Sequence, residues 1–290
     1  MLLGSIEAGG TKFICAIGNE NCEIVDHISI PTTSFSETMA KVVQYFKRFE
    51  GMVALSIASF GPIDLDPTSP RFGYILNTPK QGWAQQDFVG YLKREFSFPI
   101  YFTTDVNGSG YGEFTASKGT KHPLDSLIYY TIGTGIGAGI MYHGQLLNGV
   151  SHPEAGHVML NKHPLDSEFK GVCPFHDNCL EGLASGPSIE ARLGMRGENV
   201  PDDHPVWQVI TYYIAQALLQ STLLLRPEQI VLGGGVINPD RLVMVKQQFN
   251  QLLNNYVDVG DLDDYIVMPR VENNGSATLG NFALAKHLLA

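Results

Sequence analysis

The chain has 290 residues, of which 44% are hydrophobic and 17% are charged, as is typical of a folded globular protein. This length accommodates one large domain or two domains of medium size. The formal net charge of -10 argues against a nucleic-acid partner, because no cluster of basic residues offsets it.

Membrane association and secretion are not expected either. No apolar run approaches the roughly 20 residues that cross a membrane. The first ten residues, MLLGSIEAGG, lack the charged start and the cleavage site of a signal peptide. Four cysteines are too few for a disulfide framework in a chain of this size. We therefore expect a cytoplasmic protein without a membrane partner.

The first part of the chain shows strands and helices in alternation. Two β-prone runs at 2–7 and 13–17 flank a glycine turn, and a third strand is expected at 23–30. Apolar residues spaced three or four apart predict a helix over 36–49, which Ser36 can cap. The remaining predicted elements are a strand at 53–58, a loop at 61–83, a helix at 88–96, a strand at 100–103 and a helix over 108–116.

A similar series then begins again. Strands at 126–132 and 138–142 flank a second glycine turn, and an irregular stretch covers 151–186. The elements expected after it are a long apolar helix at 206–225, a strand at 230–232, a helix at 239–256, a strand at 265–269 and a helix at 277–289. The pattern predicts an α/β protein with two similar halves. We expect lobes at 1–118 and 119–276, with the last helix, 277–290, packing back on the first lobe.

The glycine turns suggest phosphate binding without a dinucleotide fold. Residues 133–138 match the spacing G-x-G-x-x-A, but a strand follows the turn where that fingerprint requires a helix. Backbone N–H groups of the two turns can instead cradle phosphates, and Thr11, Lys12 and Thr134 add hydroxyls and a cation. The alternative is a pair of tight hairpins without a ligand. The matching positions of the two turns, with a third glycine run at 233–235, favour phosphate binding.

A compact group of cysteines and histidines lies in the irregular stretch. Cys173, His176 and Cys179, together with His157, offer four nitrogen and sulfur ligands, which suit a closed tetrahedral zinc site. Four protein ligands leave no open position, so such a zinc ion is structural. The alternative for His157 alone is an ordinary structural histidine, and the neighbouring Cys-His-Cys group favours metal ligation.

Several of these stretches occur together in one known family. Their order along the chain is Glu7-Ala-Gly-Gly-Thr-Lys12, Thr104-Asp-Val-Asn107, Thr131-Ile-Gly-Thr-Gly-Ile-Gly137, the cysteine and histidine group, and Leu232-Gly-Gly-Gly-Val236. Over nearly its whole length the chain resembles the ROK family (repressors, open reading frames and sugar kinases). The stretches 77–83 and 151–157 resemble the bacterial zinc-containing fructokinases in particular.

This resemblance implies a two-lobed, actin-like (ribonuclease-H-like) ATPase fold with a cleft between the lobes. It implies ATP and Mg²⁺ in one part of the cleft, a hexose in the other, and a homodimer. Asp105 matches the catalytic base, which accepts a proton from a sugar hydroxyl. The alternative for Asp105 is an N-cap of the helix that follows it.

The resemblance also implies the binding residues. Glu7 matches the position that helps place magnesium, and His157 would use one ring nitrogen for zinc and the other for the sugar. The expected sugar contacts are Asn77, Thr78, Asn107, Glu154, His157 and Glu181. The expected nucleotide contacts are Gly9, Gly10, Thr11, Lys12, Thr134, Gly135, Pro187, Gly234, Gly235 and Val236.

The chain departs from the family pattern at two positions. Glu7 stands where many relatives carry aspartate, and Thr104 replaces an asparagine that contacts the sugar in relatives. Both departures bear on sugar preference, and neither removes the base.

The expected activity is ATP-dependent phosphorylation of the 6-hydroxyl of fructose. One alternative is the same reaction on glucose, mannose or N-acetylmannosamine. Another is a sugar-sensing repressor, which the acidic charge and the missing helix-turn-helix pattern argue against. A third is an inactive sugar-binding protein, and the presence of both Asp105 and Lys12 argues against it.

Overall fold

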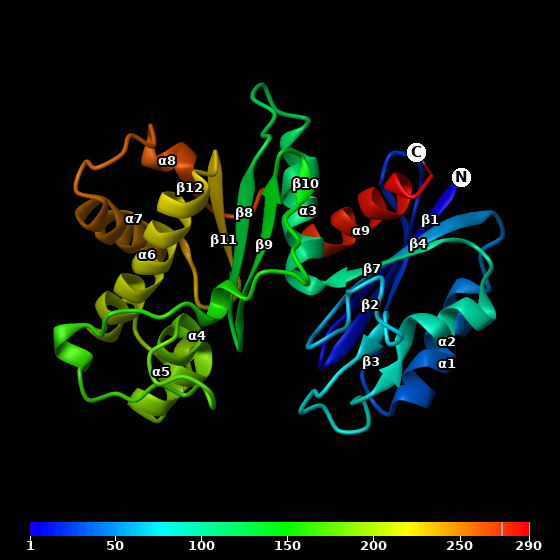
Figure 1. The fold of residues 1–290 in the computed structure, drawn as a ribbon, viewed down its shortest axis with the longest axis horizontal. Coiled ribbons are helices and arrows are strands. Elements are labelled where there is room, and N and C mark those ends of the chain that lie inside the picture. Colours follow the sequence, from blue (N-terminus) through cyan, green and yellow to red (C-terminus); the bar gives the residue numbers. More distant parts are fainter. Residues whose placement is uncertain (274, 290) are drawn as a thin grey trace. The chain divides into compact units, whose positions relative to one another are not determined.

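The computed structural model describes residues 1–273 and 275–289. The chain divides into two compact units (Figure 1). The first unit comprises Met1–Pro123, Leu146–His152 and Val271–Ala290, and the second comprises Leu124–Gln145 and Pro153–Arg270. None of the described helices has both the length and the apolar character needed to cross a membrane.

Each unit is built on a five-stranded sheet, and the two sheets share one topology. The first has the order β3-β2-β1-β4-β7, and the second has the order β10-β9-β8-β11-β12. In each sheet the first two strands of the unit form an antiparallel hairpin, and two later strands run parallel to the first strand. The repeat confirms the predicted α/β class with two similar halves.

The strands of the first sheet are β1 (Leu2–Ala8), β2 (Lys12–Gly18), β3 (Ile24–Pro31), β4 (Met52–Ser59) and β7 (Ile100–Thr104). Those of the second are β8 (Leu127–Ile132), β9 (Ile136–Tyr142), β10 (Gln145–Leu146), β11 (Gln229–Gly233) and β12 (Ile266–Val267). A two-stranded ribbon, β5 (Tyr74–Ile75) and β6 (Gln86–Asp87), lies in the first unit.

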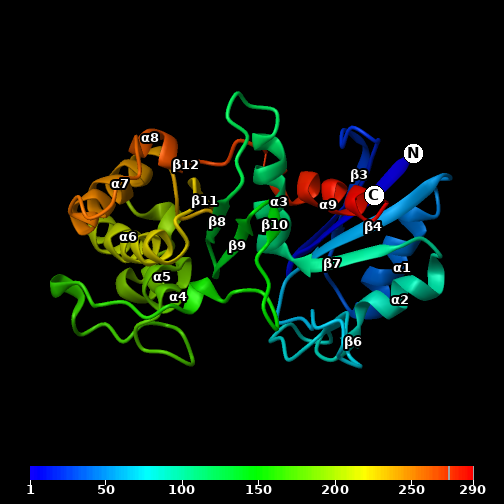
Figure 2. The ribbon, with the colours of Figure 1, turned by 45° about the horizontal axis from the view of Figure 1, so that its top comes forward.

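Helices cover both faces of the first sheet (Figures 1 and 2). On one face, α1 (Phe35–Phe46) and α2 (Phe88–Glu95) pack on a core that includes Ile6 and Phe13. On the other face, α9 (Ser276–His287) places Phe282 against Leu3 and contacts α3 (Asp105–Ser117). Successive strand residues point to opposite faces of the sheet. Because helices bury both faces, these strands carry apolar side chains on both sides.

The second unit carries its longest helices beside its sheet (Figure 1). There α6 (Val206–Leu225) packs against α7 (Pro239–Leu253), and α6 also contacts the short α4 (Leu180–Ala184). The other helical segments of this unit are η1 (Ala155–His157), η2 (Pro164–Asp166), α5 (Gly186–Leu193), η3 (Gly197–Asn199) and α8 (Leu262–Tyr265).

Several element boundaries differ from the sequence predictions. The first helix begins at Phe35, so Ser34 rather than Ser36 is its N-cap and accepts a hydrogen bond from the backbone N–H of Glu37. The helix after the catalytic-base candidate begins at Asp105, three residues earlier than predicted. The third strand begins at Ile24, one residue later than predicted, and Cys22 lies in the turn before it with a φ of 63°.

Candidate active site

The candidate residues of the first unit gather where its parallel strands end. Glu7 lies near the carboxyl end of β1, and Asp105 directly follows the last residue of β7. The strand β4 separates β1 from β7, and all three run in the same direction. The carboxyl edge of parallel strands is the usual ligand-binding edge of an α/β sheet, because loops and helix N-termini converge there.

Asp105 is the first residue of α3 and is not its N-cap. The N-cap is Thr104, whose hydroxyl accepts a hydrogen bond from the backbone N–H of Asn107 at 3.2 Å. The N-cap alternative for Asp105 is therefore wrong. Thr104, one of the two residues that depart from the family pattern, caps the helix instead. The carboxylate of Asp105 accepts a hydrogen bond from the backbone N–H of Val106 at 2.9 Å.

Burial disfavours the charged forms of both carboxylates in this unit. It raises the pKa of Asp105, an effect that the backbone N–H of Val106 and the nearby His152 partly oppose. Burial and the neighbouring charge of Asp105 raise the pKa of Glu7 to about 7, against the opposing effect of Lys12. Two acidic groups with raised pKa values at a sheet edge form a candidate reaction centre. The influence of His152 on Asp105 was not found from the sequence, because the two residues are 47 positions apart.

The first glycine turn joins β1 to β2 at the same edge. The backbone N–H of Gly9 donates to the carbonyl of Lys12, which closes the turn, and Thr32 hydrogen-bonds to the carbonyls of Gly9 and Thr11. Gly10, Thr11 and Lys12 are exposed. Of the three predicted sugar contacts in this unit, Asn107 is buried at 1% exposure, whereas Asn77 is exposed and Thr78 is partly buried.

Asn107 has one polar atom that the described residues do not satisfy. Its side-chain amide donates to the hydroxyl of Thr103 at 3.1 Å, while its side-chain carbonyl oxygen has no partner among the described residues. A buried acceptor without a partner is costly, so this oxygen is suited to a hydroxyl donor. Asn77, by contrast, accepts a hydrogen bond from Gln85 at 2.9 Å.

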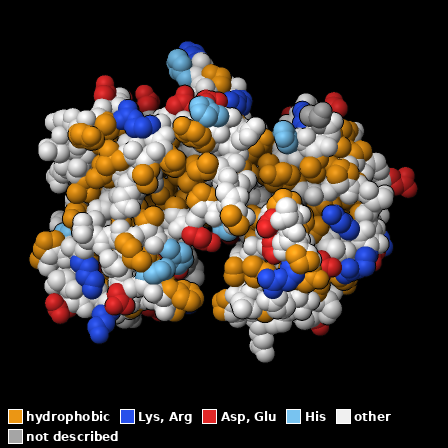
Figure 3. Space-filling view, viewed as in Figure 1, with side chains coloured by type: hydrophobic (Ala, Val, Ile, Leu, Met, Phe, Trp, Pro, Cys, Tyr) orange, Lys and Arg blue, Asp and Glu red, His pale blue; other side chains and the backbone are white. Residues whose placement is uncertain are grey.

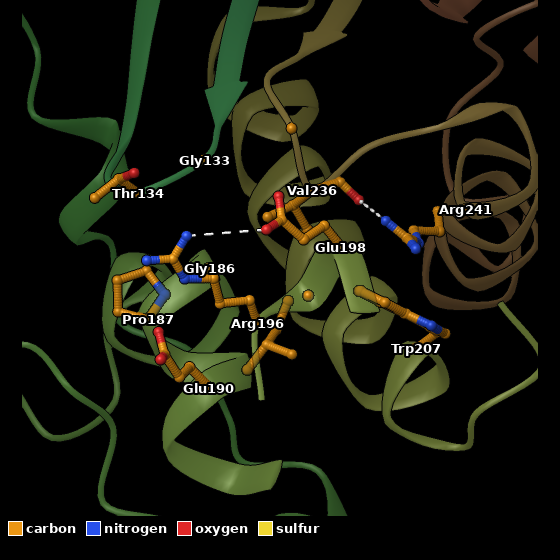
Figure 4. Close-up of a pocket in the computed structure, with 13 residues that line it drawn as sticks. Gly133, Thr134, Gly186, Pro187, Glu190, Arg196, Glu198, Trp207, Val236 and Arg241 are labelled. Carbon is orange, nitrogen blue, oxygen red and sulfur yellow. Dashed lines mark hydrogen bonds and ion pairs between the residues drawn. The ribbon is translucent and has the colours of Figure 1, made fainter. Parts of the chain in front are cut away.

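In the second unit, a cavity of about 490 Å³ lies at the carboxyl ends of β8 and β11 (Figure 4). Gly133 and Thr134 follow β8, and Gly235 and Val236 follow β11. The start of α5 forms a further part of the wall, where the backbone N–H of Gly186 donates to the carbonyl of Gly133 at 2.7 Å. The second unit therefore repeats the placement seen in the first, with glycine turns at the carboxyl edge.

Four of the predicted nucleotide contacts line this cavity, namely Thr134, Pro187, Gly235 and Val236. Gly135 and Gly234 lie beside it without lining it. The sequence analysis missed the other lining residues, Gly133, Gly186, Ile189, Glu190, Arg196, Gly197, Glu198, Trp207 and Arg241. Apart from Gly133, which belongs to the second glycine turn, they lie on or next to α5, η3, α6 and α7, and no local motif marks them. Arg196 and Glu198 face each other in Figure 4, with 3.9 Å between their charged atoms.

The cysteine and histidine group of the second unit is brought together by the fold. One ligand atom from each of His157, Cys173, His176 and Cys179 lies within 4.8 Å of the others, so the group can hold a metal ion. The Nδ1 atom of His157 lies 3.8 Å from Sγ of Cys173 and 3.6 Å from Sγ of Cys179. Burial raises the pKa of the Cys179 thiol to about 11, with further contributions from Cys173 and Glu181.

Glu181 connects this group to the second glycine turn. One carboxylate oxygen accepts a hydrogen bond from the backbone N–H of Ile136 at 2.9 Å, and the other lies 3.9 Å from Nε2 of His157. The tight approach of Gly156 to the carbonyl of Ile136, where a Cβ would overlap, places η1 and His157 beside this turn. Glu154 is exposed just before η1, and its carbonyl accepts from the backbone N–H of His157.

Basic side chains do not gather into one surface patch on the face shown in Figure 3. The described Lys and Arg side chains there are scattered among acidic and apolar ones. This distribution agrees with the acidic net charge and offers no stripe for a nucleic-acid backbone on that face.

Comparison with known proteins shows which protein family the chain matches. The model of the ROK family matches residues 3–288. The chain is 53% identical to the fructokinase of Streptococcus mutans serotype c, with 100% of this chain and 99% of that protein covered. It is 49% identical to the fructokinase of Pediococcus pentosaceus, with the same two shares covered.

Solved structures share the fold at much lower identity. The crystal structure of the ROK hexokinase from Thermus thermophilus superposes with a TM-score of 0.82 at 20% identity and covers 100% of this chain and 99% of that one. The ROK glucokinase from Streptomyces griseus, in complex with glucose and AMPPNP, gives a TM-score of 0.73 at 18% identity, with 99% and 100% covered. These likenesses confirm the actin-like fold class.

Proposed function

The chain belongs to the ROK family, and from this membership we propose that it is an ATP-dependent fructokinase. It transfers the γ-phosphoryl group of ATP to the 6-hydroxyl of D-fructose and releases fructose 6-phosphate and ADP. The observation that carries this proposal is the 53% identity to a fructokinase over the whole of both chains. The carboxylates and glycine turns of the two units supply the chemistry that such a transfer needs.

Asp105 is the proposed base. Its carboxylate accepts the proton of the 6-hydroxyl while the hydroxyl oxygen forms a bond to the γ-phosphorus and the bond to the ADP oxygen breaks. Its raised pKa makes it a better proton acceptor than an ordinary aspartate. The unpartnered carbonyl oxygen of Asn107, two residues further along α3, can accept a hydrogen bond from another sugar hydroxyl.

The glycine turns are proposed to hold the phosphates. Lys12 supplies a positive charge and the turn at 9–12 supplies backbone N–H groups in the first unit, while Thr134 offers a hydroxyl in the second. The cavity between Thr134, Pro187 and Val236 is proposed to hold the nucleoside, and its volume is within the range of small-molecule sites.

Glu7 is the proposed protein partner of magnesium. The charge of Asp105 contributes to the raised pKa of Glu7, and a nearby divalent cation offsets this repulsion. When bound with ATP, Mg²⁺ neutralises charge on the transferring phosphates. Glu7 brings a second carboxyl group to the carboxyl edge of the sheet.

Zinc is the proposed ion of the cysteine and histidine group. A tetrahedral zinc ion with Zn–S of about 2.3 Å and Zn–N of about 2.0 Å separates its sulfur and nitrogen ligands by about 3.5 Å. The three measured S···N distances, including 3.7 Å from Cys173 to His176, are 3.6–3.8 Å. Both histidines face the group with Nδ1, so Nε2 of His157 remains directed toward Glu181. Zinc would therefore fix the positions of His157 and Glu181. We assign these two side chains, together with Glu154, to sugar binding.

We expect the enzyme to work in the cytoplasm as a homodimer. Size-exclusion chromatography with light scattering measures its mass directly. A mass of one chain across the working concentration range contradicts the dimer.

The test of the proposed activity is ADP release by purified, zinc-replete protein with MgATP and separate hexoses. We expect turnover with fructose well above that with glucose, mannose or N-acetylmannosamine, and a product phosphorylated at C6 by NMR. Turnover with a different sugar keeps the kinase and changes its substrate. No turnover with any sugar refutes the proposal.

A further inference from the structure

One wall of the nucleotide cavity has almost no side chains to hold it in place. The end of β11 and the loop after it read Gly233-Gly-Gly235-Val236, and Gly234 has a φ of 91°. Its backbone lies so close to Ile132 that a Cβ on Gly234 would overlap the Ile132 backbone. Glycine restricts the backbone least, so the position of this wall depends on the hydrogen bonds that its backbone makes.

Val236 makes two such hydrogen bonds. Its backbone N–H donates to the carbonyl of Ile132 at the end of β8, at 2.9 Å. Its carbonyl accepts from Nη1 of Arg241 at 3.0 Å, which Figure 4 shows as a dashed line. The first contact ties the wall to the sheet, and the second ties it to α7.

Arg241 is itself held rigidly. Its guanidinium lies 3.5 Å from the centre of the Trp207 ring, and Nη2 donates to Asp202 at 2.9 Å. Arg241 is 7% exposed and Trp207 is fully buried, with the indole N–H donating to the carbonyl of Pro201. A planar guanidinium stacked on an aromatic ring and bonded at two nitrogens has little freedom to move.

Core packing alone does not account for an arginine at position 241. Burying a guanidinium costs desolvation energy, and an apolar side chain of similar volume is often at least as stabilising. Here Arg241, Trp207 and Val236 all line the cavity, while Nε of Arg241 is buried without a partner among the described residues. The guanidinium therefore acts on the cavity wall through its hydrogen bond to the carbonyl of Val236.

We propose that Arg241, stacked on Trp207, is a positioning residue that sets the Gly233–Val236 wall for the nucleotide. This inference rests on the proposed kinase function, since it assigns the cavity to ATP. Loss of the guanidinium releases the carbonyl of Val236 and lets the wall shift by rotation about its glycines. Nucleotide affinity falls as a result, while the sugar and the base are unaffected.

The test compares the protein with Arg241→Met, which keeps most of the side-chain length and removes the donors. We expect the Kd for MgADP, measured by calorimetry, and the KM for MgATP to rise roughly tenfold, the cost of about one buried hydrogen bond to a charged group. The KM for fructose and kcat at saturating ATP should change less than about twofold. Arg241→Lys, which keeps one donor without the planar stack, should give an intermediate rise.

Two further variants separate positioning from folding. Arg226→Met also removes a guanidinium that donates to a backbone carbonyl, that of Asp258, but Arg226 does not line the cavity. It should leave nucleotide affinity unchanged. Asp202→Ala removes the outer anchor of Arg241 at a side chain that is 60% exposed, and it should raise the Kd for MgADP by a smaller factor.

The outcomes distinguish this inference from the proposed function. If the wild-type protein binds MgADP but phosphorylates no sugar, the function fails and the calorimetric comparison still tests Arg241. If Arg241→Met is folded and binds MgADP as tightly as the wild type, the inference is overturned. It is also overturned if the variant loses fructose affinity and kcat as strongly as nucleotide affinity, or if the wild type binds no nucleotide.

Discussion

At the scale of single residues, the role proposed for Asp105 combines a catalytic requirement with a cost in stability. Its carboxylate is largely buried, and burial raises its pKa above the ordinary value of about 3.9. A base must be ionised to accept a proton, so the working form is the one that the folded protein disfavours. Such a conflict is common at sites selected for activity.

Asp105→Asn should therefore lose activity and gain stability. We expect kcat to fall by a factor on the order of 10²–10⁴, the usual contribution of a general base. The melting temperature at pH 7, measured without Mg²⁺, should rise by roughly 2 °C or more because the uncharged amide is cheaper to bury. Activity close to wild type would show that Asp105 is not the base.

The sign of the pH dependence follows from the raised pKa. Below the unfolded-state pKa of about 3.9, Asp105 is protonated in both the folded and the unfolded state, and burying it costs little stability. As the pH rises from there through the raised folded-state pKa, ionisation favours the unfolded state and the loss of stability develops. The stability advantage of Asp105→Asn should thus be largest at neutral pH and should shrink as the pH is lowered toward 4. Thermal melts at several pH values measure it, and a constant advantage contradicts this origin.

At the scale of elements, two helices of the first unit cross at unusually close range. Gly112 of α3 lies against the backbone carbonyl of Ser276, and Gly280 of α9 lies against that of Gly108, so that a Cβ at either glycine would overlap backbone atoms. Backbone cannot yield as a flexible side chain does. The glycines are therefore required by the approach of the helices, although they lower helix propensity.

Gly112→Ala should destabilise the protein even though alanine favours helices. Overpacking of this kind costs about 1–3 kcal/mol or more, which urea unfolding measures. Gly149→Ala is the matched control, because a Cβ there meets no atom within 4 Å. Equal stability of the two variants would mean that α3 and α9 separate at little cost.

The loop that carries the proposed zinc ligands is the second element to consider at this scale. Cys179 is the N-cap of α4 and accepts from the backbone N–H of Gly182, so one of the proposed metal ligands also starts the helix bearing Glu181. Removing the proposed metal should disturb Glu181 and His157 before it disturbs the proposed nucleotide cavity. The loop and the proposed sugar contacts Glu181 and His157 thus belong to one structural unit.

Cys173→Ser, or removal of zinc by a chelator, should weaken fructose binding more than ATP binding. Loss of one thiolate ligand reduces zinc affinity sharply and loosens the loop. The measurements are zinc content by atomic absorption and the separate KM values for fructose and ATP. Cys22→Ser, outside the cluster and half-buried, is the control and should change neither. Unchanged fructose affinity in zinc-free protein refutes the assignment.

At the scale of the whole molecule, neither unit is a single continuous segment. The first unit is completed by α9 from the end of the chain, and Asn281 on that helix is fully buried. Its amide donates to Ser5 and to the carbonyl of Ile6, while its carbonyl accepts from Ser56. The ring of Phe282 fills the space beside Gly18. The last helix therefore covers one face of the first sheet.

A chain ending at Arg270 should not fold stably. It lacks α9 and exposes the apolar residues of the first sheet that pack against Phe282 and Ala285, whereas most domains are stable by only about 5–15 kcal/mol. Circular dichroism and thermal melting test this. A chain ending at His287 keeps all of α9 and is the control, with nearly wild-type melting expected. A cooperative melt in the shorter chain would contradict the role of α9.

The sequence by itself determined the features that depend on neighbouring residues. Helix α6 occupies the predicted 206–225, because a long apolar run has only one way to bury its surface at that length. The α/β alternation and the family followed from contiguous strands and motifs. The site residues named from those motifs, such as Asp105 and Glu181, remain predictions, and so do their roles.

Only the tertiary structure decided what depends on residues far apart in the chain. It made Ser34 rather than Ser36 the cap of α1, since docking of Phe35 in the core fixes where that helix begins. It also brought Trp207 and Arg241 to one cavity, although they lie on different helices. A local sequence pattern indicates which surface of a helix or strand must be buried. A cavity wall is formed by elements that are distant in the sequence, and tertiary packing decides which of them meet.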